Sequence, residues 1–266
     1  MLYIYCKSDG FDILKNCRLR LNRFENFNDP FELVFGIDED TASSNIERDY
    51  EEAPNIINAW AQTLDDQHIS YDKSSTEDIL EKFAKFQIND FDRVRKIIWA
   101  NWNEKMGIAC FSESPDIIQM WAHYTENHRG IVIGIEESEF VKDEEALVKV
   151  CYRDNMVLFP ITGIPERLDQ NTIKFVPDVV GRKESNWSYE KEIRIYIRLD
   201  EKDADGNYYF KIPASSIKEI YLGLRTAETT KLIADRIKQR EEYKHLKIYK
   251  MNKHKSAYKL VPEEII

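Results

Sequence analysis

Two glutamates separated by one residue stand in the segment 187–199, which has the pattern of a β-strand. Apolar residues occupy alternate positions there and are predicted to face the core: Ile193, Ile195, Ile197 and Leu199. The opposite face then carries Glu190 and Glu192 side by side, with Arg194 next along the strand. Such a row can stabilise a cation, orient a hydroxyl or act as a general base. It is also typical of a solvated strand face with Glu–Arg pairs, and the sequence leaves both interpretations open.

A second group of polar and aromatic residues follows a predicted strand that ends near Ser112. A side chain at a strand end leaves the sheet and can meet a ligand there. Trp121 and Tyr124 have helical spacing, which favours core packing and also suits stacking on a flat ring. His123 is either a catalytic residue or a hydrogen-bonded core histidine. No metal site is expected, because the histidine five residues further on does not share its helix face and no third one is nearby.

The segment FNDPFE, residues 27–32, is a third candidate. Its Asn-Asp-Pro sequence predicts a turn in which Asp29 caps its own backbone and proline fixes the next φ. Phe27 and Phe31 are expected to fill the core. Asp29 and Glu32 are candidates to reach a functional site.

The elements that must position these residues indicate an α+β chain with a mainly antiparallel sheet. Helical spacing extends over 44–106, with a break expected at Asn89–Asp90. A further helix is expected to start at Ser114, which precedes a proline and an acid. Strands and short helices then follow in irregular order, and two of these strands, near 192–199 and 208–212, are predicted to form a hairpin through the turn at Asp205-Gly206. We expect a single domain over 1–266 whose helical insertion at about 44–106 flanks the sheet and covers the mouth of a cleft.

The composition of the chain restricts the class of protein. The 266 residues are 42% hydrophobic, 32% charged and 12% aromatic, a globular composition that can bury about 70–75% of the surface of the unfolded chain. No apolar run reaches the ~20 residues of a membrane span, and the first residues do not resemble a signal peptide, so a cytoplasmic protein with four reduced cysteines is expected.

The net charge of −10 argues against a general coat for nucleic acids, although the last quarter of the chain is rich in lysine. The sequence contains no Walker loop, GxGxxG, HExxH or GxSxG. A nucleotide held by a glycine-rich turn is therefore not expected.

Four segments of the sequence together resemble a widespread bacterial family of uncharacterised function. They are LYIY at the start, FNDPFE, CFSE…MWAHYTENHRGI and WSYEKEIR. The resemblance spans most of the chain and is weakest over the helical region. It implies no particular activity.

The order of motifs is also similar to the ADP-ribosyltransferase superfamily, whose members split NAD and transfer ADP-ribose. Glu190-x-Glu192 matches the late Glu-x-Glu element, and the segment around Ser112 resembles the aromatic-Ser-Thr-Ser element. The first strand offers Tyr3, Tyr5 and Lys7 but lacks the arginine or histidine usual there. His123 and Tyr124 are candidates to substitute for it as pocket residues. The resemblance implies an α+β fold with a mainly antiparallel, split sheet and NAD as the substrate.

Roles follow from that resemblance. Cleavage of the nicotinamide–ribose bond builds an oxocarbenium-like cation, which Glu192 would stabilise more in the transition state than in the ground state. Glu190 would deprotonate or orient the acceptor. Trp121 or Tyr124 would stack on nicotinamide or adenine, and Arg194 would meet the pyrophosphate.

Three functions remain open. The first is an ADP-ribosyltransferase that modifies a protein or nucleic acid, as a toxin or anti-phage effector with an antitoxin or defence-system partner. The second is an NAD glycohydrolase, nucleotide hydrolase or nuclease that uses the same cleft. The third is a non-enzymatic sensor or binding module. An enzyme should hold its polar residues in a concave site with perturbed carboxylates, whereas a binding module should expose its aromatic residues.

If Glu192 meets the oxocarbenium, its replacement by glutamine should lower the rate of NAD cleavage about 10²–10³-fold. Stability should change far less, because a residue in a wet cleft has no partner in the core. Nicotinamide release by the wild type and by Glu192→Gln, together with their unfolding curves, measures both quantities. A variant with full activity would remove the mechanism that the superfamily resemblance implies.

Overall fold

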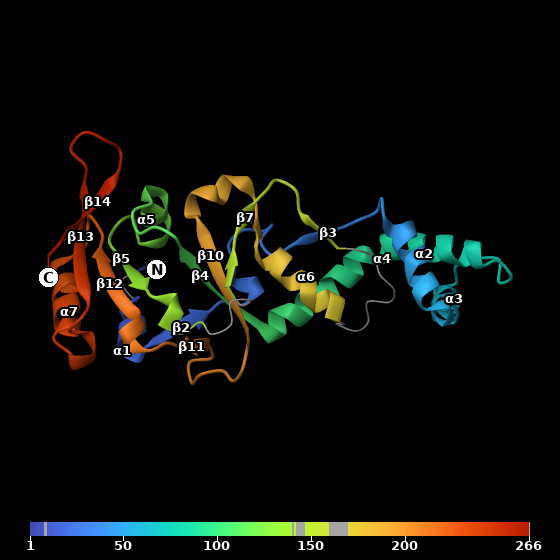
Figure 1. The fold of residues 1–266 in the computed structure, drawn as a ribbon, viewed down its shortest axis with the longest axis horizontal. Coiled ribbons are helices and arrows are strands. Elements are labelled where there is room, and N and C mark those ends of the chain that lie inside the picture. Colours follow the sequence, from blue (N-terminus) through green and yellow to red (C-terminus); the bar gives the residue numbers. More distant parts are fainter. Residues whose placement is uncertain (8–9, 140, 142–146, 160–169, 266) are drawn as a thin grey trace.

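An eight-stranded sheet forms the main body of the computed structural model, which describes residues 1–7, 10–139, 141, 147–159 and 170–265 (Figure 1). Its strand order is β14-β13-β12-β5-β1-β4-β10-β6. The strands are β1 (Leu2–Cys6), β4 (Met106–Ser112), β5 (Ile131–Ile135), β6 (Leu147–Lys149), β10 (Glu192–Arg198), β12 (Ile217–Leu222), β13 (Lys247–Lys253) and β14 (Leu260–Glu264). All neighbours are antiparallel except β12 and β13, which confirms an α+β chain with a mainly antiparallel sheet.

The described residues also form three small two-stranded sheets: β2 (Arg18–Leu21) with β11 (Tyr208–Lys211), β3 (Phe35–Ile37) with β8 (Val157–Phe159), and β7 (Cys151–Tyr152) with β9 (Arg182–Lys183). The helices near the sheet are α1 (Phe11–Asn16), α5 (Ile118–Tyr124), α6 (Gln170–Val180) and α7 (Glu228–Lys238). The predicted hairpin between the strands near 192–199 and 208–212 is wrong. The turn at Gly206 is present, but β11 pairs with β2 and not with β10.

A helical arm extends from one end of the sheet (Figure 1). It consists of α2 (Ala42–Glu52), α3 (Ile57–Asp66) and α4 (Thr76–Lys105). The break predicted at Asn89–Asp90 is wrong, because α4 runs through these residues without interruption. Its first half packs in the core of the arm through Phe83, and its second half packs through Trp102 in the core beside the sheet. One helix therefore serves two cores, and the apolar spacing on each side of residue 90 belongs to a different one.

The helix predicted to start at Ser114 begins only at Ile118. The residues before it are held by other contacts. The Ser114 carbonyl accepts a hydrogen bond from the Tyr5 hydroxyl at 2.8 Å, and the Ile117 amide donates to the same hydroxyl at 3.1 Å. The capping signal is thus overridden by a link between this turn and β1.

The sheet opens between β1 and β4. Within the described residues these strands share the single register pair Tyr3–Ser112, whereas β1 has five pairs with β5 and β4 has seven with β10. Further along β4, Ile108 exchanges both backbone hydrogen bonds with Asn22, at 2.8 and 2.9 Å. Backbone groups alternate in direction along a strand, so the N–H and C=O of Cys110 point into the opening between these two contacts.

Within the described ranges, no helix combines the length and the apolar character needed to cross a membrane.

The junction of β1 with the turn before β5 leaves no room for a side chain at Gly130, where a Cβ would lie 2.1 Å from the Cys6 carbonyl oxygen. Gly130→Ala is expected to lower the free energy of unfolding by about 1–3 kcal/mol or more, because backbone must move. The control is Gly36→Ala, whose Cβ would meet only the end of the flexible Leu158 side chain, at 3.0 Å. Urea unfolding of both variants tests this expectation, and equal stabilities would contradict the close approach.

Candidate functional site

A cleft of about 810 Å³ lies where β1 and β4 separate. Residues from both faces of β1 line it, including Ile4 and Tyr5, as expected for an opening that passes between two strands. Aromatic side chains form much of its wall: Tyr3, Tyr5, Phe27, Phe111, Tyr124 and Tyr209. Three cationic residues line it on the β1 and β2 side: Lys7, Arg18 and Arg20. Lys183, Glu190 and Glu192 line it on the side of β9 and β10.

Lys183 places its ammonium among three carboxylates. Its Nζ lies 2.7 Å from Glu190 Oε2, 3.1 Å from Glu192 Oε2 and 3.2 Å from Glu32 Oε2. All four residues are buried. Together with Arg194 they form what we call the buried charge cluster, in which three carboxylates face two cations.

Arg194 is fully buried and is held through its whole guanidinium group. Its Nε and Nη2 donate to the two carboxylate oxygens of Glu192, both at 2.9 Å. Nη2 also donates to Glu32 Oε1, and Nη1 donates to the Val180 carbonyl at 2.7 Å. This two-pronged contact fixes Glu192 at the start of β10, because the planar fork of arginine matches the carboxylate.

Glu190 reaches the same site although it does not belong to the strand. It ends a short 3-10 helix, Ser185–Glu190, and the next residue, Lys191, has a φ of 47°. The Glu190 carbonyl accepts a hydrogen bond from the Ser112 hydroxyl at 2.7 Å, which anchors the turn to the end of β4. Its Oε1 accepts a hydrogen bond from the Tyr124 hydroxyl at 2.6 Å.

The charges shift the pKa values of the cluster in opposite directions. Burial would raise the pKa of Glu192, but Arg194 and Lys183 outweigh it and lower this pKa to about 2. Burial dominates for Glu32 and raises its pKa above the usual range despite the same two cations. For Lys183 burial opposes the charge, yet the carboxylates of Glu192, Glu32 and Glu190 raise its pKa. Glu192 and Lys183 are therefore charged at neutral pH.

Two neighbouring groups stay protonated at neutral pH. Burial, together with the hydrogen bond to Glu190, raises the pKa of Tyr124. Burial and the negative charge of Glu192 raise the pKa of Cys110 well above that of a free thiol. Tyr124 can therefore donate its hydrogen to Glu190, whereas Cys110 is not an activated nucleophile.

The structure brings four of the residues singled out in the sequence to the cleft: Tyr5, Tyr124, Glu190 and Glu192. Glu190 and Glu192 are 3% and 5% exposed, so the interpretation as a solvated strand face is wrong. Glu192 pairs with Arg194 inside the protein, so Glu192→Gln is now expected to lower stability more than the replacement of a residue in a wet cleft would.

Four of the other candidates do not line the cleft. His123 is exposed, so it is neither a cleft residue nor a buried core histidine. Trp121 is fully buried and donates to the Pro115 carbonyl at 2.7 Å, which leaves no face for a ligand. Ser112 is fully buried against the Glu190 backbone. Arg194 is enclosed by its partners and is not placed to meet a pyrophosphate.

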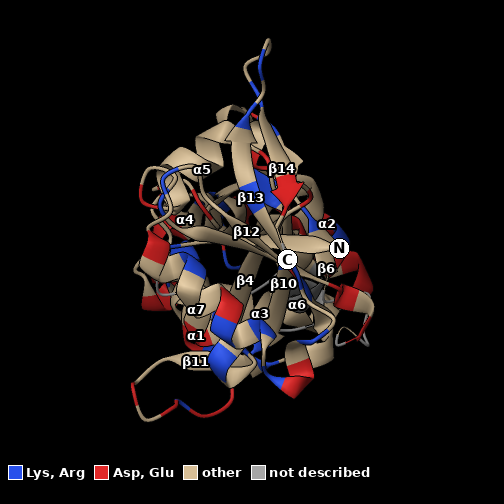
Figure 2. Ribbon diagram, turned by 90° about the vertical axis from the view of Figure 1, so that its left-hand side faces the viewer, with Lys and Arg blue, Asp and Glu red and all other residues tan. Residues whose placement is uncertain are grey.

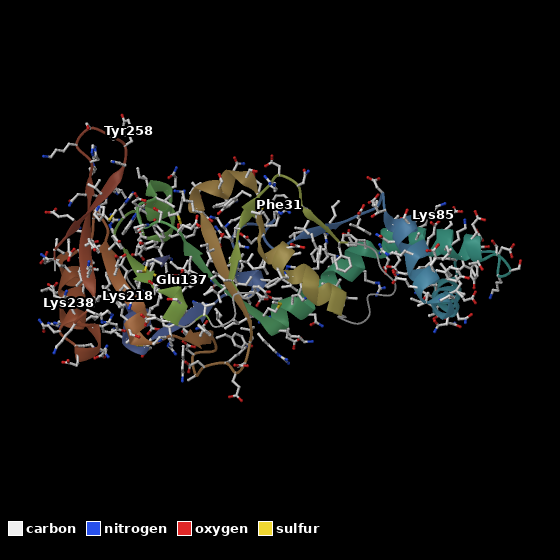
Figure 3. The ribbon with its side chains drawn as sticks, in the orientation of Figure 1. Phe31, Lys85, Glu137, Lys218, Lys238 and Tyr258 are labelled. Carbon is white, nitrogen blue, oxygen red and sulfur yellow. The ribbon has the colours of Figure 1, made fainter. Side chains whose placement is uncertain are left out.

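Lys183 is a residue of the site that the sequence does not predict. Glu32 is one of two candidates in the FNDPFE turn, together with Asp29. Lys183 follows α6 in a two-residue strand, and no motif marks it as different from other lysines. The FNDPFE turn forms as predicted, with Asp29 Oδ1 accepting from the Phe31 amide at 2.9 Å. Its phenylalanines differ, because Phe27 packs against the core while Phe31 is 64% exposed and points outward (Figure 3). Glu32, rather than Phe31, is the residue that this turn buries.

The fold and site thus define an α+β protein whose mainly antiparallel sheet opens around a cleft bordered by buried charges. Residues 120–195 match the model of a family described as "Protein of unknown function (DUF2971)". The matched segment extends from α5 into β10 and contains four of the five residues of the buried charge cluster, all but Glu32. No curated protein and no solved structure matches the chain.

Glu192→Gln is expected to lower the free energy of unfolding by ~3 kcal/mol at pH 7, because folding lowers the pKa of this carboxyl from 4.5 to about 2. A carboxyl with a lowered pKa stabilises the fold above its unfolded-state pKa and loses this contribution as the pH falls through the folded-state pKa. The difference between wild type and variant should therefore be complete above about pH 5 and shrink towards pH 2. Urea unfolding at a series of pH values measures it.

Glu113→Gln is the matched control. Glu113 follows β4, and its side chain is 38% exposed and paired with the exposed Lys149. Its replacement should change stability by less than about 1 kcal/mol. A Glu192→Gln protein as stable as this control across the pH range would contradict the buried ion pair.

Proposed function

We propose that this protein is an NAD-consuming enzyme of the ADP-ribosyltransferase type, which binds the dinucleotide in the cleft between β1 and β4. The observation that carries the proposal is the juxtaposition in this one cleft of carboxylates from the β10 side with cations from the β1 and β2 side. This corresponds to the concave, charged site with perturbed carboxylates that an enzyme was expected to have.

The lining of the cleft suits a ligand with flat rings, sugars and phosphates. Its volume of about 810 Å³ falls within the range of small-molecule sites, about 300–1,000 Å³. Tyr5, Tyr124 and Tyr209 offer rings for stacking. The hydroxyls of Tyr124 and Tyr209 donate to Glu190 and Asp205 and can still accept a hydrogen bond from a sugar. Lys7 and Arg20 are exposed at the cleft and offer positive charge to a pyrophosphate. The backbone N–H and C=O of Cys110 point into the opening and add one hydrogen-bond donor and one acceptor.

Of the two carboxylates, Glu190 is better placed to act on a substrate than Glu192. Both oxygens of Glu192 are engaged by Arg194, and one also contacts Lys183. Each oxygen of Glu190 has one partner, Tyr124 or Lys183, and keeps capacity to accept another hydrogen bond. We therefore assign the contact with the ribose to Glu190, and to Glu192 the task of holding Arg194 and Lys183 in place.

The proposed step breaks the bond between ribose C1′ and the nicotinamide nitrogen, and its electron pair leaves with neutral nicotinamide. The ribose then carries an oxocarbenium-like positive charge, which the negative charge of Glu190 stabilises. An oxygen or nitrogen of the acceptor donates an electron pair to C1′ and loses its proton to the solvent. A macromolecular acceptor gives a transferase, and water gives the glycohydrolase that is the alternative function.

Glu190→Gln should lower the rate of nicotinamide release about 10²–10³-fold, because glutamine keeps the size of the side chain but removes the charge that meets the cation. NAD binding should persist, since the tyrosines and cations of the cleft remain. Incubation with radiolabelled NAD and cell lysate measures the reaction, and calorimetric titration with NAD measures binding.

Tyr124→Phe is the companion variant. It removes the hydrogen bond to Glu190 and leaves the charge, so a smaller loss of rate is expected. Label in protein or nucleic acid supports the transferase, and free ADP-ribose supports the glycohydrolase. A wild-type protein that binds no NAD and releases no nicotinamide would overturn the proposal and favour the sensor or binding module.

A further inference from the structure

The hairpin formed by β13 and β14 is a basic element in an acidic protein. Residues 247–262 contain five lysines and one histidine but no aspartate or glutamate, in a chain with a net charge of −10. Lys253, Lys255 and Lys259 are exposed. Figure 2 shows the blue of Lys and Arg along this hairpin, which projects beyond the rest of the chain. Positive charge is thus concentrated on an element that projects from the molecule.

A tyrosine stands fully in solvent among these lysines. Tyr258 is 104% exposed and lies at the tip of the hairpin (Figure 3). The turn that carries it is ordered by backbone hydrogen bonds, from the His254 amide to the Lys259 carbonyl at 3.0 Å and from the Lys259 amide to the Ala257 carbonyl at 2.9 Å. An aromatic ring in this position contributes little to folding, so its apolar face is open to another molecule.

The acidic residues of the hairpin are confined to its base. Glu263 and Glu264 pair in register with Lys250 and Tyr249, at the other end of the strands from the turn. The tip therefore presents an aromatic ring flanked by cations and by no carboxylate of its own strands.

We propose that this hairpin binds single-stranded nucleic acid, with Tyr258 stacked on a base and the flanking lysines on phosphates. An aromatic ring combined with basic residues along a backbone path is how proteins hold single strands without reading their sequence. An acidic peptide would use the lysines and leave the ring unused, and an anionic membrane would favour more than one apolar residue at the tip. The inference does not depend on the proposed function, because β13 is three strands away from β1 in the sheet.

The test is fluorescence anisotropy of a labelled single-stranded oligonucleotide of about 12 nucleotides, in RNA and DNA forms, titrated with the full chain. Tyr258→Ala should weaken binding about 5- to 150-fold, whereas Tyr258→Phe should bind like the wild type because stacking is kept. The double variant Lys255→Ala/Lys259→Ala should reduce the slope of log affinity against log salt by about 0.7 for each phosphate that it no longer neutralises.

The matched controls lie elsewhere on the surface (Figure 3). Phe31→Ala removes another exposed aromatic, and Lys85→Ala removes an exposed lysine of the helical arm. Both should bind like the wild type, and thermal unfolding should show every variant folded. No binding at about 50 mM salt, equal binding by Tyr258→Ala, or tighter binding to a duplex or to anionic vesicles than to the single strand would each overturn the proposal.

Discussion

The pairing of one fully buried guanidinium group determines much of this structure. Arg194 lies inside the protein, where an unpaired charge would cost several kcal/mol. Glu192 on the same strand and Glu32 from the FNDPFE turn neutralise it, and the Val180 carbonyl at the end of α6 takes a further donor. The FNDPFE turn, whose Glu32 lies 162 residues before Arg194, is thereby held against β10 and the end of α6. The arginine contributes to fold specificity because an arrangement without these acceptors would leave its charge buried and unpaired.

The same cluster borders the cleft and leaves one carboxylate open towards it. Two cations and three carboxylates make up the cluster. Both carboxylate oxygens of Glu192 are engaged by Arg194, whereas those of Glu190 can each accept a further hydrogen bond. Lys183 lies between the two glutamates and screens each from the other's charge. A substitution at Glu192 therefore disturbs the fold and the site together, whereas Tyr124 offers a way to alter Glu190 alone. Under the proposed function, stability and activity are therefore separable only through residues at the edge of the cluster, such as Tyr124.

The opening of the sheet supplies the space. A continuous ladder between β1 and β4 would close the cleft, but one register pair, at Tyr3, is all that the described residues form between these strands. Asn22 takes over the hydrogen bonds of Ile108 instead. The helical arm does not cover this cleft, since no described residue of α2, α3 or α4 is among those that line it. The expectation that this helical region covers the mouth of the cleft is therefore wrong.

The sequence by itself determined the classes of element and several members of the site. Alternation located β10, turn chemistry located the FNDPFE loop, and the polar pattern drew attention to Glu190, Glu192 and Tyr124, because each of these signals depends on neighbours close in the chain. Only the tertiary structure decided that Arg194 faces inward and that Lys183 completes the cluster. Whether Arg194 and Lys183 lie in solvent or in the core depends on Glu32, which is 162 residues before Arg194, and on the turns that bring Lys183 and Glu190 back to β10. Local spacing carries no record of either.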